Sequence, residues 1–418
     1  MYQAPRGTSD ILPEEQAYWR YIEQKAVNLC RLYGYQRIDT PTFEDTRLFS
    51  RSIGGDTDIV EKEMYTFEDK GGNRITLRPE GTAPVCRAYL EHGMHNLPQP
   101  VKLYYLTSIF RYERPQSGRY REHRQFGCEA FGEEAPALDA EVIEIAWRFF
   151  SQLGIGKLTL LLNSIGCREC RPGYLGILKE YYQRYSEDLC KDCKARLKRN
   201  PLRLLDCKKP LCRRIAGSAP QSVDSLCAEC AEHFRSLRNH LELLGIPFVV
   251  DHCLVRGLDY YTRTVFEIQP ESEGAQSTLG GGGRYDYLIE ELGGKPTPAM
   301  GFASGMERIV LNLKKQEIDV APPSQPGIFI ASLGENAGSE ALKLASRLRR
   351  AGIRVIQPGT GKSLKAQLRH ANACRAALTI IVGEDEVKSG TVLLRDMATS
   401  EQSSFPASEI AEEIKSRC

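Results

Sequence analysis

The chain has 418 residues, of which 41% are hydrophobic and 26% charged, and its 56 Lys and Arg nearly balance 54 Asp and Glu. This length and composition exclude a single small binding module, a disordered chain and a collagen-like chain, and they predict a globular protein of several domains. The formal charge of +2 neither requires nor excludes a polyanionic partner. The apolar stretches are too short to span a bilayer and the N-terminus lacks a signal-peptide core, so we expect a cytoplasmic protein without membrane contact.

The first predicted elements are a helix and an antiparallel hairpin. The helix begins near Pro13, because proline suits the first turn of a helix. Residues 101–113 and 124–132 are predicted as the two strands of the hairpin, since they are rich in β-branched and aromatic side chains. A second helix, with Asp139 as its N-cap, and a strand at residues 157–164 follow.

Residues 167–235 differ in composition from their surroundings and are predicted as an insertion into this sheet. They carry fifteen Lys and Arg against nine Asp and Glu. Such an excess suits a nucleic-acid partner, although a solvated surface has the same composition. Strand-like residues resume at 252–269 and 298–305, and the glycine run Gly280–Gly283 between them predicts a tight turn.

The last part of the chain has the pattern of a separate small domain. A proline-containing linker is predicted at residues 323–327. Residues 328–418 then alternate strand and helix as an α/β domain does, with a last helix beginning at Pro406.

Eight of the fourteen cysteines lie in the insertion, and without an export signal they are predicted to be thiols or metal ligands. The candidate zinc ligands, spaced as in zinc ribbons, are Cys190, Cys193, Cys227 and Cys230. A second set is available from Cys167, Cys170, Cys207 and Cys212. Eight thiolates fit two tetrahedral sites, but the spacing does not say which pairs share an ion. Free thiols in a small core are the alternative.

Three arginines from distant segments are candidates for binding phosphate. Arg111 and Glu113 end the predicted strand 101–113, Arg256 lies in the predicted strand region, and Arg308 lies at the start of a helix. A guanidinium is permanently charged and grips phosphate oxygens in two places. The alternative is that each is an ordinary surface arginine in a salt bridge, and spacing alone does not decide between the two.

The segments that carry these arginines resemble the class II aminoacyl-tRNA synthetases, and within that class the histidyl-tRNA synthetase family. The resemblance covers nearly the full length. It rests on RGTSDILP near the start, the Pro41 region as first motif, LRPEGTAPVCRAY, the second motif FRYERPQSGRYREHRQFGCEAFG, LVRGLDYYTRTVFE and the third motif GFASGMERIV. LVRGLDYY is the specific segment, because the second and third motifs are shared across the class.

The resemblance implies an α+β fold in which an antiparallel sheet is flanked by helices. The catalytic core would be residues 1–322, interrupted by the insertion 167–235, and residues 328–418 would be an α/β anticodon-binding domain. It also implies activation of L-histidine by ATP with Mg²⁺ to histidyl-adenylate, and transfer of histidine to the 3′ end of tRNA(His). A homodimer formed through the Pro41 region is expected.

The resemblance also implies roles for particular residues. Arg111 would hold the α-phosphate of ATP, with Glu113 beside it. Arg256 would bridge the substrate carboxylate and the α-phosphate, and Arg308 would take the γ-phosphate. These cations would act where negative charge builds up in the transition state.

Further residues match the family's histidine contacts. Glu129 and Tyr261 correspond to contacts of the imidazole, and Tyr260 belongs to the same wall. The contacts of the α-amino group correspond to Glu80, Gly81, Thr82 and Gln125. For Glu129 the alternative is a structural pairing with an arginine.

Three other functions remain open at this point. One is a non-catalytic relative, the regulatory subunit of ATP phosphoribosyltransferase, which typically lacks the C-terminal domain and key site residues. Another is a synthetase for threonine, proline or glycine, against which LVRGLDYY argues. The third is a tRNA- or metal-binding protein without activity.

Overall fold

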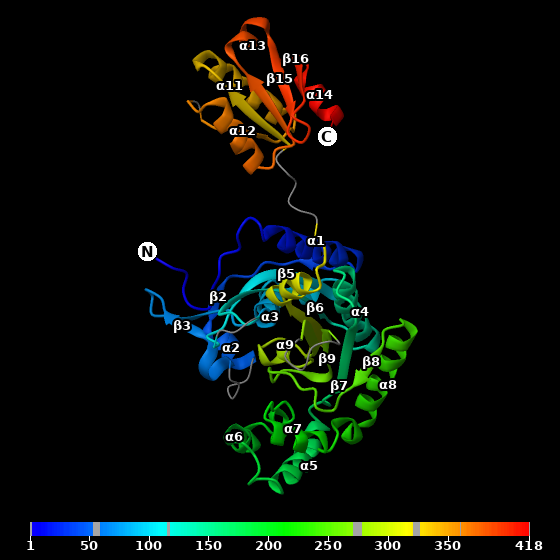
Figure 1. Ribbon diagram of the computed structural model, residues 1–418. Helices are drawn as coiled ribbons and strands as arrows, with labels where there is room; N and C mark the ends of the chain where they lie inside the picture. The colour runs from blue at the N-terminus through cyan, green and yellow to red at the C-terminus, as the bar shows by residue number, and fades with distance from the viewer. Residues whose placement is uncertain are drawn as a thin grey trace. The chain divides into compact units, whose positions relative to one another are not determined.

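The computed structural model describes residues 2–52, 59–114, 118–270, 278–320, 327–359 and 361–417, which form two compact units (Figure 1). The first unit spans Met1–Val320 and the second Ala321–Cys418. Residues 323–326 of the predicted linker lie outside the described residues. Within the described ranges, no helix combines the length and the apolar character needed to cross a bilayer.

An eight-stranded, mostly antiparallel sheet is the centre of the first unit. Its strand order is β1-β5-β6-β11-β10-β9-β7-β8, with parallel pairs only at the two edges. The predicted hairpin is confirmed, because β5 and β6 pair antiparallel along their length. The strands are β1 (Gln36–Arg37), β5 (Val101–Phe110), β6 (Glu122–Phe131), β7 (Leu158–Ser164), β8 (Phe248–Val250), β9 (Thr262–Pro270), β10 (Gly280–Arg284) and β11 (Ala299–Gly305).

Four helices cover one face of this sheet and enclose the main core. They are α1 (Gln16–Leu32), α4 (Pro136–Gln152), α8 (Ala228–Leu243) and α10 (Met306–Lys315). Along β6, Phe126 and Cys128 point into this core, so that the intervening residues face the opposite side. The prediction of Asp139 as an N-cap is wrong: α4 begins three residues earlier, and Asp139 lies inside it, fully buried against Arg284.

The glycine run also differs from its prediction. Gly280–Gly283 is not a turn but part of the central strand β10, paired on both sides. A Cβ on Gly281 would lie 2.6 Å from the carbonyl oxygen of Phe266, and one on Gly282 would lie 2.6 Å from the Cα of Phe302. Side chains are absent here because neighbouring strands and their side chains already fill the space.

Smaller elements flank the sheet near its open face. A three-stranded sheet has the order β2-β4-β3, and α3 follows it directly in the chain. These elements are β2 (Phe43–Asp45), α2 (Thr46–Ser52), a π-helix (Ile59–Glu63), β3 (Tyr65–Glu68), β4 (Arg74–Leu77), α3 (Thr82–Glu91), a 3₁₀ turn (Met94–Asn96) and α9 (Leu288–Glu291).

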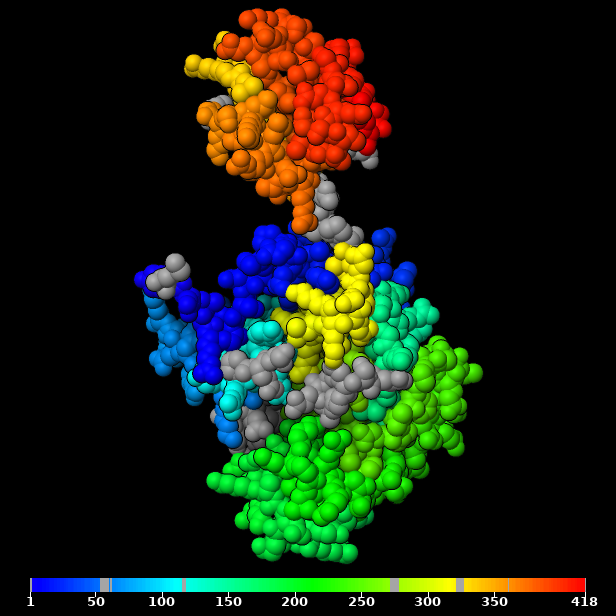
Figure 2. All heavy atoms as spheres, viewed as in Figure 1, coloured from blue at the N-terminus to red at the C-terminus, as the bar shows by residue number. Residues whose placement is uncertain are grey.

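The insertion forms a helical body between β7 and α8 (Figures 1 and 2, green). Its elements are α5 (Arg171–Gln183), α6 (Lys191–Arg199), the 3₁₀ turns η3 (Pro201–Leu204) and η4 (Ser222–Ser225), and α7 (Pro210–Gly217). Tyr174, Leu178 and Tyr182 on α5 are buried in a hydrophobic cluster that the insertion shares with the sheet, including Tyr105 and Phe131. The predicted boundary at residue 235 falls inside α8, whose Leu237 packs in the main core.

The second unit is a separate α/β layer structure. Its sheet order is β13-β12-β14-β15-β16, with β12 parallel to both neighbours and the last two pairs antiparallel. Pro406 ends a strand, and the last helix begins only at Ile410. The elements are β12 (Ile328–Ser332), α11 (Glu335–Arg350), β13 (Val355–Ile356), α12 (Leu364–Ala373), β14 (Leu378–Val382), α13 (Glu384–Ser389), β15 (Thr391–Asp396), β16 (Gln402–Pro406) and α14 (Ile410–Arg417).

Candidate active site

A large cavity lies on the face of the eight-stranded sheet that the four helices leave open. Its volume is about 1230 Å³, and its walls come from β6, β9, β10 and β11, from the start of α3 and α10, and from the insertion. Arg111, Arg256 and Arg308, which are far apart in the sequence, all line it. The predicted convergence of these guanidinium groups is therefore present.

Arg111 is fixed at the point where β5 ends. Its Nε donates a hydrogen bond of 2.7 Å to the carbonyl of Pro79, and its Nη1 lies 3.9 Å from a carboxylate oxygen of Glu113. Glu113 also lines the cavity and accepts a hydrogen bond of 3.3 Å from Arg119. The segment predicted as the second motif thus brings two arginines and one glutamate to the cavity wall.

Arg256 lies in the irregular segment before β9 and not in a strand, which corrects the prediction. Its Nη1 donates to the carboxylate of Glu267 on β9. Burial lowers the pKa of Arg256, but the adjacent Glu267 outweighs burial and raises it overall. Its Nε is buried and has no hydrogen-bond partner. A permanent cation with an unused donor therefore lines the cavity.

Arg308 on α10 is held by two backbone carbonyls. Nε donates to Gly118 at 3.2 Å and Nη1 to Thr278 at 2.9 Å. His123 lines the same cavity from β6. Burial, and then the charges of Arg111 and Arg308, lower the pKa of His123 to about 3. An anion would relieve the repulsion in this region.

The start of α3 supplies a second wall of the cavity. Both carboxylate oxygens of Glu80 accept hydrogen bonds of 2.7 Å, one from the backbone N–H of Thr82 and one from that of Ala83. Burial raises the pKa of Glu80. Gly81 does not line the cavity. Its Cβ position is occupied by the ring of Tyr105, so that a side chain there has no room.

Glu129 on β6 is the most enclosed acid of the cavity. One of its oxygens accepts hydrogen bonds from the hydroxyls of Thr82 at 2.7 Å and Tyr105 at 3.2 Å, and the other accepts one from the hydroxyl of Tyr285. Burial raises the pKa of Glu129 to about 8, and the hydroxyl donors oppose the shift. Within the described part of the chain no arginine forms an ion pair with Glu129, which argues against a structural salt bridge.

Tyr105 and Tyr285 were not among the predicted site residues. Tyr105 faces Glu129 because it lies on the same side of the β5–β6 hairpin, opposite Gly127. Strand alternation would have predicted that Tyr105 faces Glu129, but only if the register of the β5–β6 hairpin had been known. Tyr285 directly follows Arg284 at the end of the glycine strand, which was predicted as a turn.

The remaining predicted residues also lie on the cavity wall. Gln125 is on the same face of β6 as Glu129, and its side-chain oxygen is buried without a partner. The rings of Tyr260 and Tyr261 pack with centroids 4.8 Å apart and are both nearly buried. The structure thus brings every predicted substrate residue except Gly81 to one cavity.

The insertion contributes a basic rim to this cavity. Its lining residues include Arg196, Arg203, Lys208, Lys209 and Arg213. They come from α6, η3 and the start of α7. Against Asp192 and Asp206, which also line the cavity, the insertion therefore adds a net positive charge to that of the three arginines.

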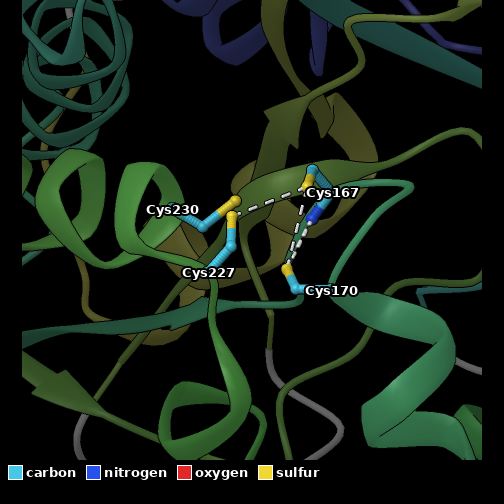
Figure 3. Close-up of side chains that lie close together, drawn as sticks. All are labelled: Cys167, Cys170, Cys227 and Cys230. Atoms are coloured by element: carbon cyan, nitrogen blue, oxygen red, sulfur yellow. Dashed lines mark hydrogen bonds between the residues drawn. The ribbon is translucent and has the colours of Figure 1, made fainter.

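The eight insertion cysteines form two groups, and the predicted pairing is wrong. Cys190 and Cys193 lie with Cys207 and Cys212, which we call the distal cluster. Cys227 and Cys230 lie with Cys167 and Cys170, which we call the neck cluster (Figure 3). The prediction was wrong because the spacing within each Cys-x-x-Cys pair does not indicate which other pair lies beside it in the folded chain.

The geometry of both clusters fits a tetrahedral thiolate site. Within each cluster the sulfur atoms all lie within 4.8 Å of one another. The distances are 3.7 Å for Cys167–Cys170, 3.9 Å for Cys167–Cys227 and 3.9 Å for Cys190–Cys207. Zn–S bonds of about 2.3 Å place tetrahedral sulfurs about 3.8 Å apart, whereas a disulfide needs about 2.05 Å. None of the eight is in a disulfide.

Comparisons with known proteins agree on one family. A family model for histidyl-tRNA synthetase matches residues 7–169 and 203–309, and a model for an anticodon binding domain matches residues 327–417. A histidine–tRNA ligase of Dehalococcoides mccartyi is 59% identical over 415 residues, covering 99% of each chain. One of Desulforudis audaxviator is 52% identical over 411 residues, covering 98% of each.

Solved structures show the same relationship. The apo histidyl-tRNA synthetase of S. aureus superposes with a TM-score of 0.84 at 38% identity, covering 99% of this chain and 100% of the other. A protein of Bacillus halodurans C described as an ATP phosphoribosyltransferase regulatory subunit/histidyl-tRNA synthetase gives a TM-score of 0.65 at 22% identity, with 92% and 98% covered. The second likeness concerns the fold alone.

Proposed function

The chain belongs to the histidyl-tRNA synthetase family, and from this premise we propose that its cavity activates L-histidine with ATP and that the histidine is then transferred to the 3′ end of tRNA(His). The observation that carries the proposal is the meeting of Arg111, Arg256 and Arg308 in one cavity with Glu129. The full-length identity to histidine–tRNA ligases, together with these residues, disfavours the non-catalytic regulatory subunit.

The first step joins two anions, so the cavity must supply positive charge. The carboxylate of histidine attacks the α-phosphorus of ATP, the bond to the β-phosphate breaks, and pyrophosphate leaves with that electron pair. In our proposal Arg111 holds the α-phosphate, Arg256 bridges it to the substrate carboxylate, and Arg308 binds the γ-phosphate. Preorganised cations lower the barrier because they act where the transition-state charge develops.

Magnesium enters with ATP as part of the substrate. Glu113 and Glu267 both line the cavity and offer the carboxylate oxygens that Mg²⁺ prefers. In the second step the terminal ribose of the tRNA attacks the carbonyl carbon of the adenylate and AMP leaves. The chain's residues contribute here by holding the adenylate in place.

The pocket around Glu129 supports recognition of the imidazole ring. We propose that Glu129 and Tyr261 contact the two ring nitrogens, that Tyr260 packs beside the ring, and that Glu80, Thr82 and Gln125 bind the α-amino group. Gly81 lets the start of α3 approach Tyr105. A buried acid with hydroxyl partners rejects a ring without nitrogens, because such a ring would leave polar groups unpaired.

The tRNA would meet both units. The basic rim of the insertion suits the phosphates of the acceptor end near the cavity. The second unit matches an anticodon binding domain, and its helix α12 exposes Lys365 and Arg369. We place this reaction in the cytoplasm, where tRNA charging occurs.

A homodimer is part of the proposal, and the three-stranded sheet offers a surface for it. Phe43 and Phe67 point to the same face of that sheet and are 52% and 47% exposed. Paired apolar side chains left open on one face are typical of an interface. Sedimentation of the full chain tests this, and a monomer at micromolar concentration would contradict it.

Zinc is the ion that we propose for the two cysteine clusters. Sets of four thiolates select Zn²⁺ among common ions, and the sulfur separations support a tetrahedral arrangement. Each site would carry a net charge of −2. The surrounding lysines and arginines of the insertion compensate for this charge.

Histidine-dependent exchange of pyrophosphate into ATP tests the proposed activity. We expect labelled pyrophosphate to enter ATP only when L-histidine and Mg²⁺ are present. Exchange with threonine, proline or glycine, or no exchange at all, would contradict the proposal. Charging of tRNA(His) transcripts then tests the second step separately.

A further inference from the structure

The segment Arg256–Tyr261 is held at both ends by residues of the insertion. At its start, Nη1 of Arg203 donates a hydrogen bond of 3.2 Å to the carbonyl of Arg256. Asn200 donates one of 2.9 Å to the carboxylate of Asp259. At its end, Nη2 of Arg171 donates one of 2.5 Å to the carbonyl of Tyr261. The segment has no strand or helix of its own, so these bonds help to set its position.

The residues that bond Arg256 and Asp259 belong to the loop of the distal cluster. Asn200 and Arg203 lie between Cys193 and Cys207, two members of that cluster. The backbone N–H of Cys190 donates to the sulfur of Cys212 at 3.4 Å, which closes the base of the same loop. An ion bound by these sulfurs would tie both ends of the loop together and lower its conformational entropy.

Arg171, which holds the end of the segment, is next to the neck cluster in the chain. Arg171 directly follows Cys170 and is the first residue of α5. Its backbone N–H donates to the carbonyl of Cys167 at 3.0 Å, and its Nε donates to the carbonyl of Ile165 at 3.1 Å. Figure 3 shows Cys167 and Cys170 turned toward the sulfur atoms of Cys227 and Cys230.

We propose that the two clusters bind one zinc ion each and that these ions are the supports of segment 256–261: the distal ion positions Arg256, and the neck ion positions Tyr261. The proposal rests on the function proposed above and adds a metal dependence to it. At each site Zn²⁺ replaces four thiol protons, which pass to solvent, and no electron is transferred. Asn200, Arg203 and Arg171 are positioning residues, because they act through the segment.

The two ions would affect different kinetic constants. Arg256 is proposed to act in the transition state, so its displacement lowers kcat with little effect on the KM for histidine. Tyr261 is proposed to contact the bound ring, so its displacement raises the KM for histidine. Loss of a hydrogen bond to a positioned group costs about tenfold in either constant.

Metal content is the first measurement. Protein purified without chelators should contain two zinc ions per chain by plasma emission spectrometry. The pair Cys190→Ser/Cys193→Ser and the pair Cys170→Ser/Cys230→Ser should each retain one. Absence of zinc from the unmodified protein, or loss of both ions from one pair of substitutions, would overturn the proposal.

The kinetics of the same two variants come next. In histidine-dependent pyrophosphate exchange, the distal variant should lose about tenfold in kcat and keep the KM for histidine within twofold. The neck variant should show the reverse. Equal changes in both variants would mean a general loss of folding and would contradict the separate roles.

Two substitutions remove the hydrogen bonds to segment 256–261 and leave both cysteine clusters intact. Arg203→Ala should lower kcat about tenfold in the unmodified protein but have little further effect in an Arg256→Ala background, because it acts through Arg256. Arg171→Ala should raise the KM for histidine. Lys198→Ala is the matched control, since Lys198 is an exposed cation on α6 that does not line the cavity. Additive effects of Arg203→Ala and Arg256→Ala would rule out the support role.

The outcomes separate this inference from the proposed function. If the unmodified protein exchanges pyrophosphate with histidine but contains no zinc, only the inference fails. If it contains two zinc ions but shows no exchange with histidine, the proposed function fails.

Discussion

Arg284, the last residue of the glycine strand β10, is fully buried and donates a hydrogen bond of 3.0 Å from its Nε to the carboxylate of Asp139 on α4. It also donates to the carbonyl of Glu133 at 3.0 Å and to Asp286 at 3.1 Å. The ion pair joins the central strand to the helix that covers it. Neither residue faces the cavity, so its role is structural.

Removing one partner of this pair should strongly destabilise the first unit. Arg284→Ala leaves the buried Asp139 carboxylate without its arginine, with only Nε2 of His233 3.6 Å away, and breaking a buried ion pair in this way costs about 3 to 5 kcal/mol. The double variant Arg284→Met/Asp139→Leu should lose less, since the fully buried Asp139 carboxylate is removed together with its arginine and only the partly exposed Asp286 loses a partner. Both tryptophans lie in the first unit, so the free energy of unfolding in urea can be followed by their fluorescence. A loss for the single variant no larger than for the double would contradict this account.

Arg256→Ala should lower the rate of adenylate formation more than substrate binding. A donor that acts in the transition state contributes about 2 to 4 kcal/mol, a loss of roughly 30-fold to 10³-fold in kcat. Arg148→Ala, which removes an arginine half-exposed beside Glu144, is the control and should be neutral. Pyrophosphate exchange measures both, and a normal rate in Arg256→Ala would refute the assigned role.

Gly281→Ala should damage the site although it adds one methyl group. The new Cβ would lie 2.6 Å from the carbonyl of Phe266 and 2.8 Å from Nη1 of Arg256, so strand or guanidinium must move. We expect about 1 to 3 kcal/mol of destabilisation and a lower exchange rate. Gly176→Ala is the matched control, because a Cβ on this helical glycine meets nothing within 4 Å. Equal activity of the two variants would argue against the close packing of β10.

Glu129 should make the unliganded protein less stable as pH rises. Its pKa is raised from 4.5 to about 8 in the folded protein, so its stabilising contribution is complete below pH 4.5 and is lost as pH rises through 8. Glu129→Gln stays neutral. The stability of this variant relative to the unmodified protein should therefore increase between pH 5 and 8, by at most about 1.4 kcal/mol per pH unit. Urea unfolding at four pH values tests this, and a constant difference would contradict it.

Glu129→Ala should also weaken the choice of histidine over ring analogues. The ratio of kcat/KM for histidine to that for phenylalanine should fall by several orders of magnitude from an expected value of about 10⁴. Glu122→Ala, on an exposed position of the same strand, should leave the ratio unchanged. Selectivity retained in Glu129→Ala would mean that another group reads the ring.

The sequence predicted those parts of the site whose motifs also define local structure. Arg111, Gln125 and Glu129 follow from one hairpin, because strand alternation assigns its residues to faces. Arg308 follows from a strand that runs into a helix. The sheet, the insertion and the separate α/β domain could be predicted because local sequence patterns also define them.

The errors concern features set by tertiary packing. A run of four glycines is typical of a turn, and the sequence does not show that Arg256, Phe266 and Phe302 occupy the space where side chains would be. Asp139 resembles an N-cap because its partner Arg284 is distant in the chain. The cysteine pairs were misassigned because local spacing carries no information on which distant pairs meet.

The neck cluster marks the place where the insertion joins the sheet. The sulfur atoms of Cys167 and Cys227 are 3.9 Å apart, so the polypeptide leaves and re-enters the core at nearly the same point. Residues 171–226 thus leave and rejoin, at one point, the crossover that runs from β7 through α8 to β8. A short artificial bridge could replace this segment and leave the sheet's topology untouched.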